Sequence, residues 1–342
     1  MQYELRTQVI EPVRATYTPL VERRGDRPAS RYEEGTVDLQ ATEHFHYRPL
    51  WDPAHELYDP GYSVLKLTDP YSFADPRQYY YAPYVTARAQ MFDAFSRTLD
   101  YIDDHGLFGR MAQEWRDLMV AALLPIRHYE GGAQLISAEG ARFAYGTSVE
   151  QCLSYAAFDR IGNAQMLSRV GLALGEGDTG PLTEARQSWL ERAELQPLRR
   201  YVEELLVERD WAVSAFALDL ADRLLYPLLY RHLDNAALAA GQSALSLVAQ
   251  HLHAWFTDHR KWVDALVAAW TGDSEHGAAN TEALAAIVRR RLPQAVSAVA
   301  NLAAAADAAV DTGARAAAEE QAERLRADLA AAGIPTQHKE QA

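Results

Sequence analysis

Apolar residues recur at helical spacing along most of the chain. From residue 75 to about residue 331 they return every three or four positions, and no segment alternates convincingly with a period of two. Asp75-Pro76 has the order of an N-cap followed by proline at the first helical position, and the apolar stripe that follows ends near Gly106. The pattern predicts a first helix over 76–105, kinked in its first turns by Pro83.

Further helices are predicted after the first one. A second stripe runs from Met111 to Ile126, and Gly131-Gly132 is expected to separate it from a third, very long helix. The remaining helices are expected at about 133–174, 183–209, 211–233, 242–271 and 281–331. Mostly long helices joined by short turns predict an all-α antiparallel bundle, in which the apolar stripes are buried against one another. We expect this helical domain to span residues 75–331, followed by a C-terminal tail at 332–342.

Residues 1–74 show no sustained period and are rich in Tyr, Arg and acidic residues. Prolines interrupt the segment at Pro12, Pro19, Pro28, Pro49, Pro53, Pro60 and Pro70. We interpret it as an extended arm that contacts partner subunits, while the stripes from Tyr84 onward supply the bundle core without the arm. Aromatic and Arg side chains are enriched at buried protein contacts, which makes Phe45, Tyr47, Arg48 and Trp51 the candidate anchors.

Composition narrows the class of protein. The 342 residues are 49% hydrophobic, which is ordinary for a globular protein with a sizeable core. A net charge of −14 repels polyanions, so we expect neither nucleic acid nor an anionic membrane as a partner. The start lacks the order of a signal peptide, and the most apolar window carries Asp219, Asp222 and Arg223. These features predict a cytoplasmic protein without a membrane span.

Few residues offer metal or catalytic chemistry. A di-iron bundle needs Glu from two helices and Glu-x-x-His from two others. The single E-x-x-H, Glu43 to His46, lies in the proline-bounded arm, as does Asp52 to His55. The first predicted helix has no Glu and the third has no His, so two of the four ligand sources are missing.

Other motifs do not change this picture. The chain has no Walker loop, no G-x-G-x-x-G, no G-x-S-x-G and no paired cysteines. Cys152 is alone and is expected to be a buried thiol, while His251 and His253 point to different helix faces. We therefore predict no catalytic, cofactor-binding or metal-binding residue in this chain. A surface metal site on His44, His46 and His55 remains the alternative for the arm.

Three stretches are more specific than the helical pattern. They are GDRPASRYEE at 25–34, HFHYRPLWDPAHELYD at 44–59 and LKLTDPYSFADPRQYYYAPYVTARAQM at 65–91. Together they resemble the β subunit of the hydroxylase component of bacterial multicomponent monooxygenases, closest to the phenol hydroxylase branch. The resemblance implies a ferritin-like domain without metal, and a di-iron centre in a partner α subunit. It also implies two α, two β and two small γ subunits, with a separate reductase and a regulatory protein.

The metal-binding α subunits of that family carry segments of the type D-E-x-R-H. The comparable segments in this chain are FDRIGNAQ and TDHRKW. Arg160 and Asn163 take the Glu and His positions in the first segment, and His259 and Trp262 take them in the second. A guanidinium and an indole N–H are hydrogen-bond donors only, so neither pair can hold iron as Glu-x-x-His does. The resemblance therefore implies that the fold is kept and the metal site is absent.

The expected function is that of a non-catalytic structural β subunit. Its assembly would hydroxylate a small aromatic such as phenol, using O2 and electrons derived from NADH. Toluene or alkene oxidation stays open as the reaction of the assembly. From different classes, a stand-alone ferritin-like oxidase with an unconventional metal site and a free-standing helical scaffold also stay open.

Overall fold

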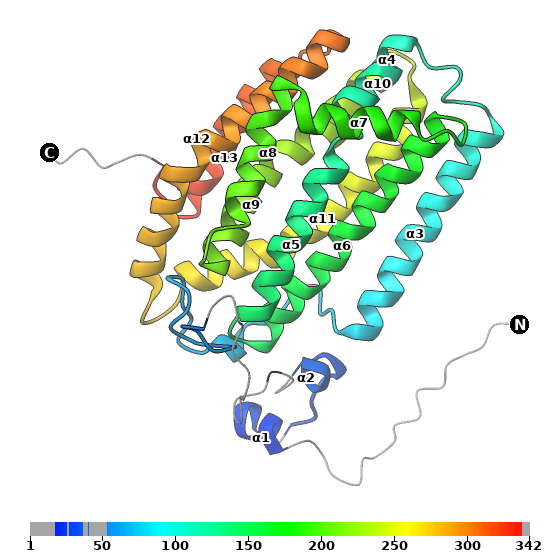
Figure 1. Cartoon of the computed structure of the whole chain (residues 1–342). Helices are drawn as coiled ribbons and strands as arrows, with labels where there is room; N and C mark the ends of the chain where they lie inside the picture. Colours follow the sequence, from blue (N-terminus) through cyan, green and yellow to red (C-terminus); the bar gives the residue numbers. More distant parts are fainter. Residues whose placement is uncertain (1–17, 26, 37–39, 41–52, 337–342) are drawn as a thin grey trace, which may run out of the picture.

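The computed structural model describes residues 18–25, 27–36, 40 and 53–336. Within these ranges every regular element is helical, and the long helices lie side by side in one bundle (Figure 1). The all-α prediction is confirmed. In this part of the chain, no helix combines the length and the apolar character that crossing a membrane requires.

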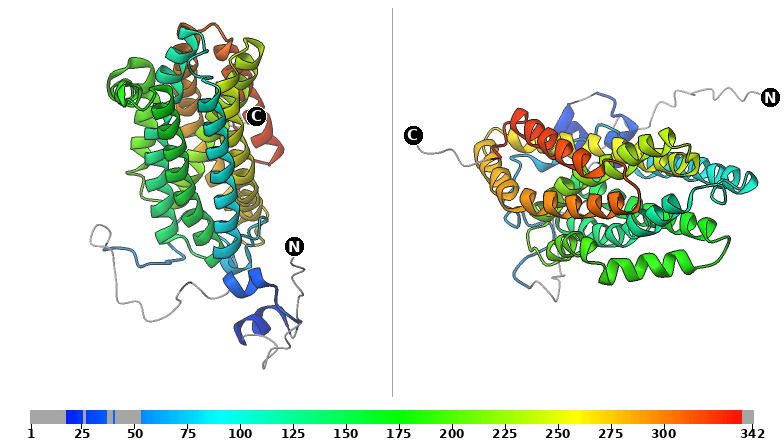
Figure 2. Two further views of the ribbon diagram at one scale, coloured as in Figure 1. Left: turned by 90° about the vertical axis from the view of Figure 1, so that its right-hand side faces the viewer. Right: turned by 90° about the horizontal axis from the view of Figure 1, so that it is seen from above.

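Four helices form the centre of the bundle, and the others surround them (Figures 1 and 2). The central helices are α5 (Ile126–Phe143), α6 (Thr147–Leu174), α9 (Trp211–Pro227) and α11 (Ser243–Thr271). Around them lie α3 (Tyr81–Asp104), α4 (Gln113–Leu118), α7 (Gly180–Glu191), α8 (Gln196–Leu205), α10 (Leu233–Ala239), α12 (Gly277–Ala309) and α13 (Ala314–Ala331). Two π-helical turns, Met119–Leu123 and Leu228–His232, continue α4 and α9. The inward apolar stripes of the bundle helices merge into one hydrophobic core, as the periodicity predicted.

The first long helix begins later than expected, at Tyr81. Asp75 does not cap it, because its carboxylate binds the Arg77 guanidinium at 2.9 Å and the Arg77 backbone N–H at 2.9 Å. Pro83 is therefore the third residue of α3, where a backbone N–H has no partner within the helix. The expected kink has no cause there, and α3 continues unbroken to Asp104.

The expected break at Gly131-Gly132 is wrong, since both glycines lie inside α5. Gly132 allows α5 to approach α8, because a Cβ there would lie 2.8 Å from Cγ2 of Val202. The chain turns instead at Gly146, whose φ of 114° suits only glycine. The Gly146 N–H donates to Oε1 of Gln40 at 2.8 Å. The third helix consequently starts at Thr147 rather than near residue 133.

Two other expected helices are each divided. The 183–209 segment breaks at Arg192, between α7 and the short 3-10 turn Ala193–Leu195 that precedes α8. The 281–331 segment breaks before Gly313, where the Asp307 carboxylate accepts the N–H groups of Thr312, Ala314 and Arg315. By contrast, the helix expected at 242–271 is confirmed as α11.

The described part of residues 1–74 contains helices α1 (Thr18–Arg24) and α2 (Arg31–Thr36) and the 3-10 turn Pro70–Ser72. Residues 64–68 run across the ends of three bundle elements. The N–H of Val64 donates to Asp210 at 2.7 Å, that of Lys66 to Asn280 at 2.9 Å, and that of Thr68 to Asp273 at 2.7 Å. Leu65 and Phe73 belong to the buried core. Residues before 75 thus contribute side chains to the core, which the sequence pattern assigned to the stripes from Tyr84 onward.

Candidate functional site

The centre of the bundle holds a buried cluster of charged and polar side chains. Arg160 on α6 lies between Glu130 on α5 and Asp222 on α9, and all three residues are at most 1% exposed. Its Nη1 donates to Oε2 of Glu130 at 3.2 Å and to Oδ1 of Asp222 at 3.2 Å, and its Nη2 donates to Oδ2 of Asp222. One guanidinium thus joins carboxylates from two other helices. We call Arg160, Glu130 and Asp222 the Arg160 centre.

Two tyrosine hydroxyls and one amide extend the hydrogen bonds of the Arg160 centre. Tyr226 stands one turn after Asp222 on α9 and donates to Oε1 of Glu130, while Tyr129 donates to Oδ1 of Asp222 at 2.7 Å. Asn163, three residues after Arg160 on α6, donates to the Tyr226 hydroxyl at 3.2 Å. The i, i+3 and i, i+4 spacings place these groups on the inward faces of their helices.

Burial controls the ionisation of the Arg160 centre. Burial raises the pKa of both the Glu130 and Asp222 carboxyls, and the Arg160 guanidinium offsets part of that rise. Burial would lower the pKa of Arg160, but the two carboxylates outweigh it and raise that pKa well above its ordinary value. The guanidinium therefore stays charged, and it balances one of the two buried acids.

His259 and Trp262 on α11 lie beside the Arg160 centre, and both are 4% exposed. The Trp262 indole N–H donates to Nδ1 of His259 at 3.3 Å, so the proton of the neutral imidazole sits on Nε2. Trp255 stacks on the same ring with a centroid distance of 4.8 Å. Burial lowers the pKa of His259 well below its ordinary value, and nearby guanidinium groups lower it further.

Asp159, next to Arg160 on α6, belongs to a second buried network. Arg88 on α3 binds its two oxygens at 2.7 Å each, and Tyr84 and Trp255 donate to it at 2.8 and 2.9 Å. Arg88 also reaches Asp258 on α11 at 3.2 Å. This network connects α3 to α6 and α11. Both oxygens of the Asp159 carboxylate accept hydrogen bonds from it.

The structure brings together both segments singled out by sequence, with Arg160, Asn163, His259 and Trp262 all buried at the bundle centre. Cys152 is a buried free thiol, as expected. His55 contacts the Tyr62 ring, with centroids 4.2 Å apart. The other arm candidates lie outside the described residues; they are Glu43, His44, Phe45, His46, Tyr47, Arg48, Trp51 and Asp52.

Sequence reasoning missed Glu130, Asp222 and Tyr226. A signal was present, because Glu130 lies one turn after Ile126 and Asp222 lies one turn after Leu218, on the stripes that the helices bury. An acid on a buried stripe needs a partner of opposite charge or a hydrogen-bond donor. The sequence alone did not show that Arg160 is the partner of these two acids.

The Arg160 centre does not fit a di-iron site. A guanidinium can donate hydrogen bonds but cannot coordinate a metal ion. Here the Arg160 guanidinium lies between Glu130 and Asp222, the two acids that could otherwise bind a cation. Among residues 18–25, 27–36, 40 and 53–336, no group of three or more His, Cys, Asp or Glu side chains could hold a metal ion. The cavity beside Arg160, Asp222 and His259 measures about 30 Å³, whereas ligand pockets typically measure about 300 Å³ or more. The centre therefore suits a packed structural core.

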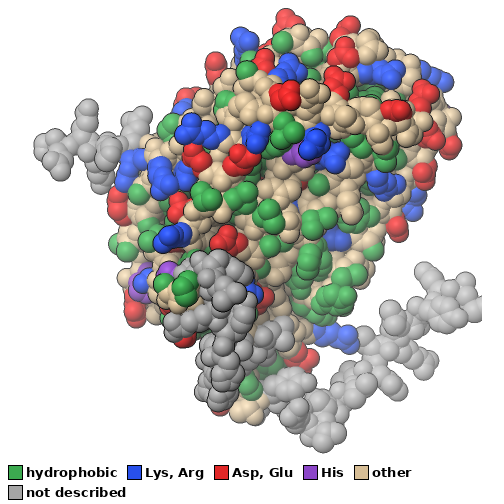
Figure 3. All heavy atoms as spheres, viewed as in Figure 1, with side chains coloured by type: hydrophobic (Ala, Val, Ile, Leu, Met, Phe, Trp, Pro, Cys, Tyr) green, Lys and Arg blue, Asp and Glu red, His purple; other side chains and the backbone are tan. Residues whose placement is uncertain are grey.

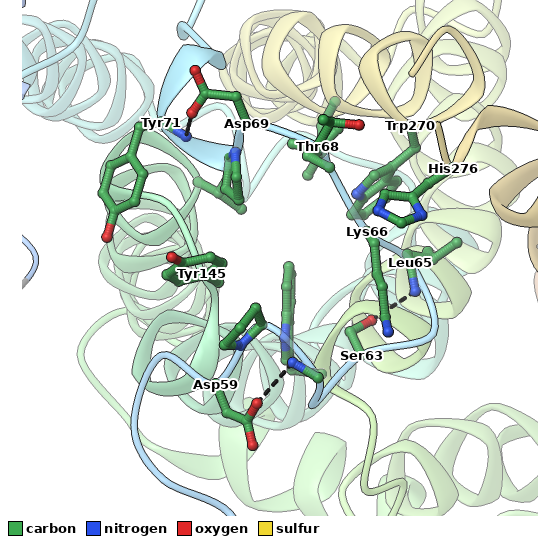
Figure 4. Close-up of a pocket in the computed structure, with 17 residues that line it drawn as sticks. Asp59, Ser63, Leu65, Lys66, Thr68, Asp69, Tyr71, Tyr145, Trp270 and His276 are labelled. Atoms are coloured by element: carbon green, nitrogen blue, oxygen red, sulfur yellow. Dashed lines mark hydrogen bonds between the residues drawn. The ribbon is translucent and has the colours of Figure 1, made fainter. Parts of the chain in front are cut away.

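A larger pocket of about 530 Å³ opens at the end of the bundle, under residues 59–71 (Figure 4). Trp270 and His276 lie on one side of it and Tyr145 on another. Its acids stabilise the surrounding loop, since Asp59 accepts the Gly61 N–H at 2.7 Å and Asp69 accepts the Tyr71 N–H at 3.1 Å. These bonds shape the pocket wall and do not form an acid–base pair.

Known proteins resemble the chain over most of its length. The pattern of the Methane/Phenol/Alkene Hydroxylase family matches residues 51–274. The oxygenase component DmpL of phenol 2-monooxygenase from Pseudomonas sp. (strain CF600) is 39% identical over 267 residues, which are 78% of this chain and 81% of DmpL. MhpL from Acinetobacter pittii (strain PHEA-2), also an oxygenase component of phenol 2-monooxygenase, is 35% identical over 81% of this chain and 83% of its own length.

Solved structures share the fold. Phenol hydroxylase from Pseudomonas sp. OX1, in a xenon-pressurised crystal, has a TM-score of 0.81 at 32% identity, over 94% of this chain and 98% of that chain. Toluene 4-monooxygenase has a TM-score of 0.72 at 18% identity, over 85% of this chain and 97% of that chain. The ferritin-like bundle predicted from the resemblance is confirmed. Together with the family pattern and the 39% identical relative, these likenesses establish that the chain belongs to the methane/phenol/alkene hydroxylase family.

Proposed function

We propose that this chain is a non-catalytic structural β subunit in the hydroxylase of a multicomponent monooxygenase of the phenol type. The Arg160 centre carries the proposal. It fills the middle of a ferritin-like bundle with one guanidinium and the two carboxyl groups that accept its hydrogen bonds, and the cavity beside it measures about 30 Å³. The named relatives, both oxygenase components of phenol 2-monooxygenase, support the choice of phenol over toluene or alkenes.

The role of the Arg160 centre is to hold the bundle together. Arg160 joins α6 to α5 and α9, and the Asp159 network joins α6 to α3 and α11. Removing one partner of such a buried ion pair is strongly destabilising, because the remaining charge has no counter-ion. A rigid bundle of this kind can support a partner subunit without reacting itself.

The chemistry is assigned to other chains of the assembly. A larger α subunit would carry the di-iron centre and bind O2 and the small aromatic substrate. A small γ subunit, a reductase that supplies electrons from NADH and a regulatory protein would complete a cytoplasmic system with two α, two β and two γ subunits. Residues 42–60 of this chain are proposed as contact surface for the α subunit.

Metal analysis of two samples tests the proposed function. The isolated chain and its co-expressed complex with the larger subunit are each reconstituted anaerobically with Fe(II), desalted and analysed for iron. We expect iron in the complex and no stoichiometric iron in the isolated chain. About two irons per isolated chain, lost on Glu130→Ala or Asp222→Ala, would refute the proposal in favour of a stand-alone oxidase.

Turnover of the complete system tests the substrate class. With reductase, regulatory protein and NADH present, we expect hydroxylation of phenol to exceed that of toluene and of a small alkene at equal concentration. A clear preference for toluene or the alkene would contradict the phenol assignment and leave the structural role intact.

A further inference from the structure

The pocket at the end of the bundle has no role in the proposed function. It lies under residues 59–71 and measures about 530 Å³, within the range of about 300–1,000 Å³ that is typical of ligand pockets. We call it the bundle-end pocket. Its lining combines an apolar floor with a small number of polar groups, which is the usual composition of a site for a small organic molecule.

The floor of the bundle-end pocket belongs to the hydrophobic core. Val149, Leu266, Trp211 and Trp270 line the pocket, and each is at most 6% exposed. The two indole rings are tilted against each other, with centroids 6.4 Å apart. Tyr145 adds a third ring on another side of the pocket (Figure 4). Flat apolar rings on more than one side favour a planar aromatic ligand over an aliphatic one.

Lys66 gives the bundle-end pocket an unpaired positive charge. Acidic and basic side chains are mixed over the face that Figure 3 shows, whereas the Lys66 ammonium forms no hydrogen bond or ion pair with any described residue. The two acids of the lining are engaged. Asp59 accepts a backbone N–H of its own loop at 2.7 Å, and Asp69 lies 3.7 Å from the Arg23 guanidinium. The pocket therefore offers a charge-assisted hydrogen bond to an anionic ligand and disfavours a cationic one.

Asn280, a fully buried residue of α12, holds Lys66 in place. Its amide oxygen accepts the Lys66 N–H at 2.9 Å, and its amide nitrogen donates to the carbonyl groups of Lys66 at 2.7 Å and Trp270 at 2.8 Å. One side chain thus fixes the backbone of both the cation and an aromatic wall. Lys66, Trp270 and His276 lie along the same side of the pocket in Figure 4. A preformed site of this kind loses little conformational freedom when a ligand binds.

We propose that the bundle-end pocket binds a small aromatic acid, with the ring among the Trp211, Trp270 and Tyr145 side chains and the carboxylate on the Lys66 ammonium. A carboxylate is ionised at neutral pH, whereas a phenol keeps its proton because its pKa is about 10. The ammonium therefore selects the acid over the uncharged phenol. The inference concerns residues of this chain alone and does not depend on the proposed function.

Calorimetric titration of the complete chain tests the ligand class. The probe is benzoate, and cyclohexanecarboxylate, phenol and benzylamine are compared with it at the same pH and ionic strength. We expect benzoate to bind saturably. Cyclohexanecarboxylate should bind at least ~3-fold more weakly because it lacks the flat ring, and phenol and benzylamine at least ~10-fold more weakly because they lack the negative charge. The inference is wrong if benzoate shows no saturable binding, or if any comparison ligand binds as tightly.

Replacement of Lys66 tests the site. Lys66→Met removes the charge and keeps an apolar side chain, so we expect at least ~10-fold weaker binding of benzoate. The matched control is Lys261→Met, because that side chain is 56% exposed and does not line the bundle-end pocket; its affinity for benzoate should change less than ~2-fold. Circular dichroism and urea midpoints check that both variants fold. Equal affinity of Lys66→Met and the native chain would overturn the inference.

Lysine acetylation provides a measurement on the native chain. The sequence contains three lysines, Lys66, Lys261 and Lys339, so peptide mass spectrometry follows each amine separately. With benzoate at ~10-fold above its Kd, acetylation of Lys66 by an N-hydroxysuccinimide ester should slow ~10-fold, because the site is then mostly occupied. Lys261 should react at an unchanged rate. If benzoate binds and Lys66 is acetylated as fast as before, the ligand occupies another site and the inference is wrong.

Discussion

Arg160 holds two buried carboxylates from two different helices, Glu130 on α5 and Asp222 on α9. Each carboxylate also accepts a tyrosine hydroxyl, from Tyr226 and Tyr129 respectively. A metal cation would fill the same electrostatic role between acids, but the guanidinium does so with fixed hydrogen bonds and no open coordination position. The identity of this one residue therefore decides the chemistry of the bundle centre.

Arg160→Met should destabilise the chain strongly. The substitution leaves two buried acids without their cation, and breaking a buried pair in this way costs about 3–5 kcal/mol. Urea unfolding followed by circular dichroism measures the loss. The control Arg324→Met removes an ion pair whose side chains are 59% and 65% exposed, and such surface pairs contribute about 0–1 kcal/mol. Equal effects of the two variants would contradict the structural role of Arg160.

His259 should make the stability depend on pH. Burial lowers its pKa well below the ordinary value, so the folded chain keeps the imidazole neutral while the unfolded chain binds a proton below about pH 6.5. The contribution of His259 is thus fully present above that pH and is lost as the pH falls, at up to about 1.4 kcal/mol per pH unit.

The variant His259→Gln isolates this effect. Between pH 7.5 and 5.5, the free energy of unfolding of the native chain should fall by about 1 kcal/mol more than that of the variant. Parallel pH profiles for the two proteins would show that His259 does not titrate as its burial requires.

At the scale of elements, tertiary packing places the ends of the helices. Gly131 and Gly132 lower the intrinsic helix propensity of α5 by about 1 kcal/mol each relative to Ala, yet α5 continues through both. Its buried stripe packs against α6, α8 and α9, and this packing outweighs the local preference. The chain turns instead at Gly146. This glycine adopts a positive φ, and its N–H donates a hydrogen bond to the Gln40 side chain.

The two glycines of α5 provide a matched pair of variants. Gly131→Ala should stabilise the chain by about 0.5–1 kcal/mol, because a Cβ there meets no atom within 4 Å and the helix propensity rises. Gly132→Ala should be less stable than Gly131→Ala by about 1–3 kcal/mol, because the new Cβ would overlap the stiff Val202 side chain. Thermal and urea unfolding of both variants measure the difference. Equal stabilisation by both would mean that α5 and α8 do not approach closely at Gly132.

At the scale of the whole molecule, residues 64–68 join the ends of three bundle elements. Asp210 caps α9 by accepting the Ala212 N–H at 3.0 Å and also accepts the Val64 N–H. The Asn280 amide donates to the Lys66 carbonyl at 2.7 Å and accepts from its N–H. Hydrogen bonds from the Thr68 hydroxyl and from backbone N–H groups lower the pKa of Asp273. This segment is part of the bundle, although its sequence has no helical period.

Two truncations compare this segment with the rest of the arm. A chain starting at residue 75 should be markedly less stable than one starting at residue 53, because only the first loses the buried Leu65 and Phe73 and the partners of Asp210 and Asn280. Deleting two buried large hydrophobic side chains alone corresponds to several kcal/mol. Urea midpoints for the two chains measure the difference. Equal stability would restore the view that all of residues 1–74 is an independent arm.

Local pattern in the sequence was sufficient for the fold class but not for the site. Helical periodicity is a property of neighbouring residues, so the all-α bundle and the limits of α11 could be predicted and are confirmed. Positions 160, 163, 259 and 262 were singled out by the resemblance to the family's metal-binding segments, and the structure buries all four at the bundle centre.

Only the tertiary structure decided which groups meet. Arg160 is 30 residues from Glu130 and 62 from Asp222, and Lys66 is 214 from Asn280, so no local pattern relates them. The same holds for the turn at Gly146, whose N–H binds Gln40, and for the continuity of α5 through Gly131 and Gly132. In each case contacts between distant segments outweigh local helix preferences of about 1 kcal/mol per residue. These contacts form only when the whole chain has folded.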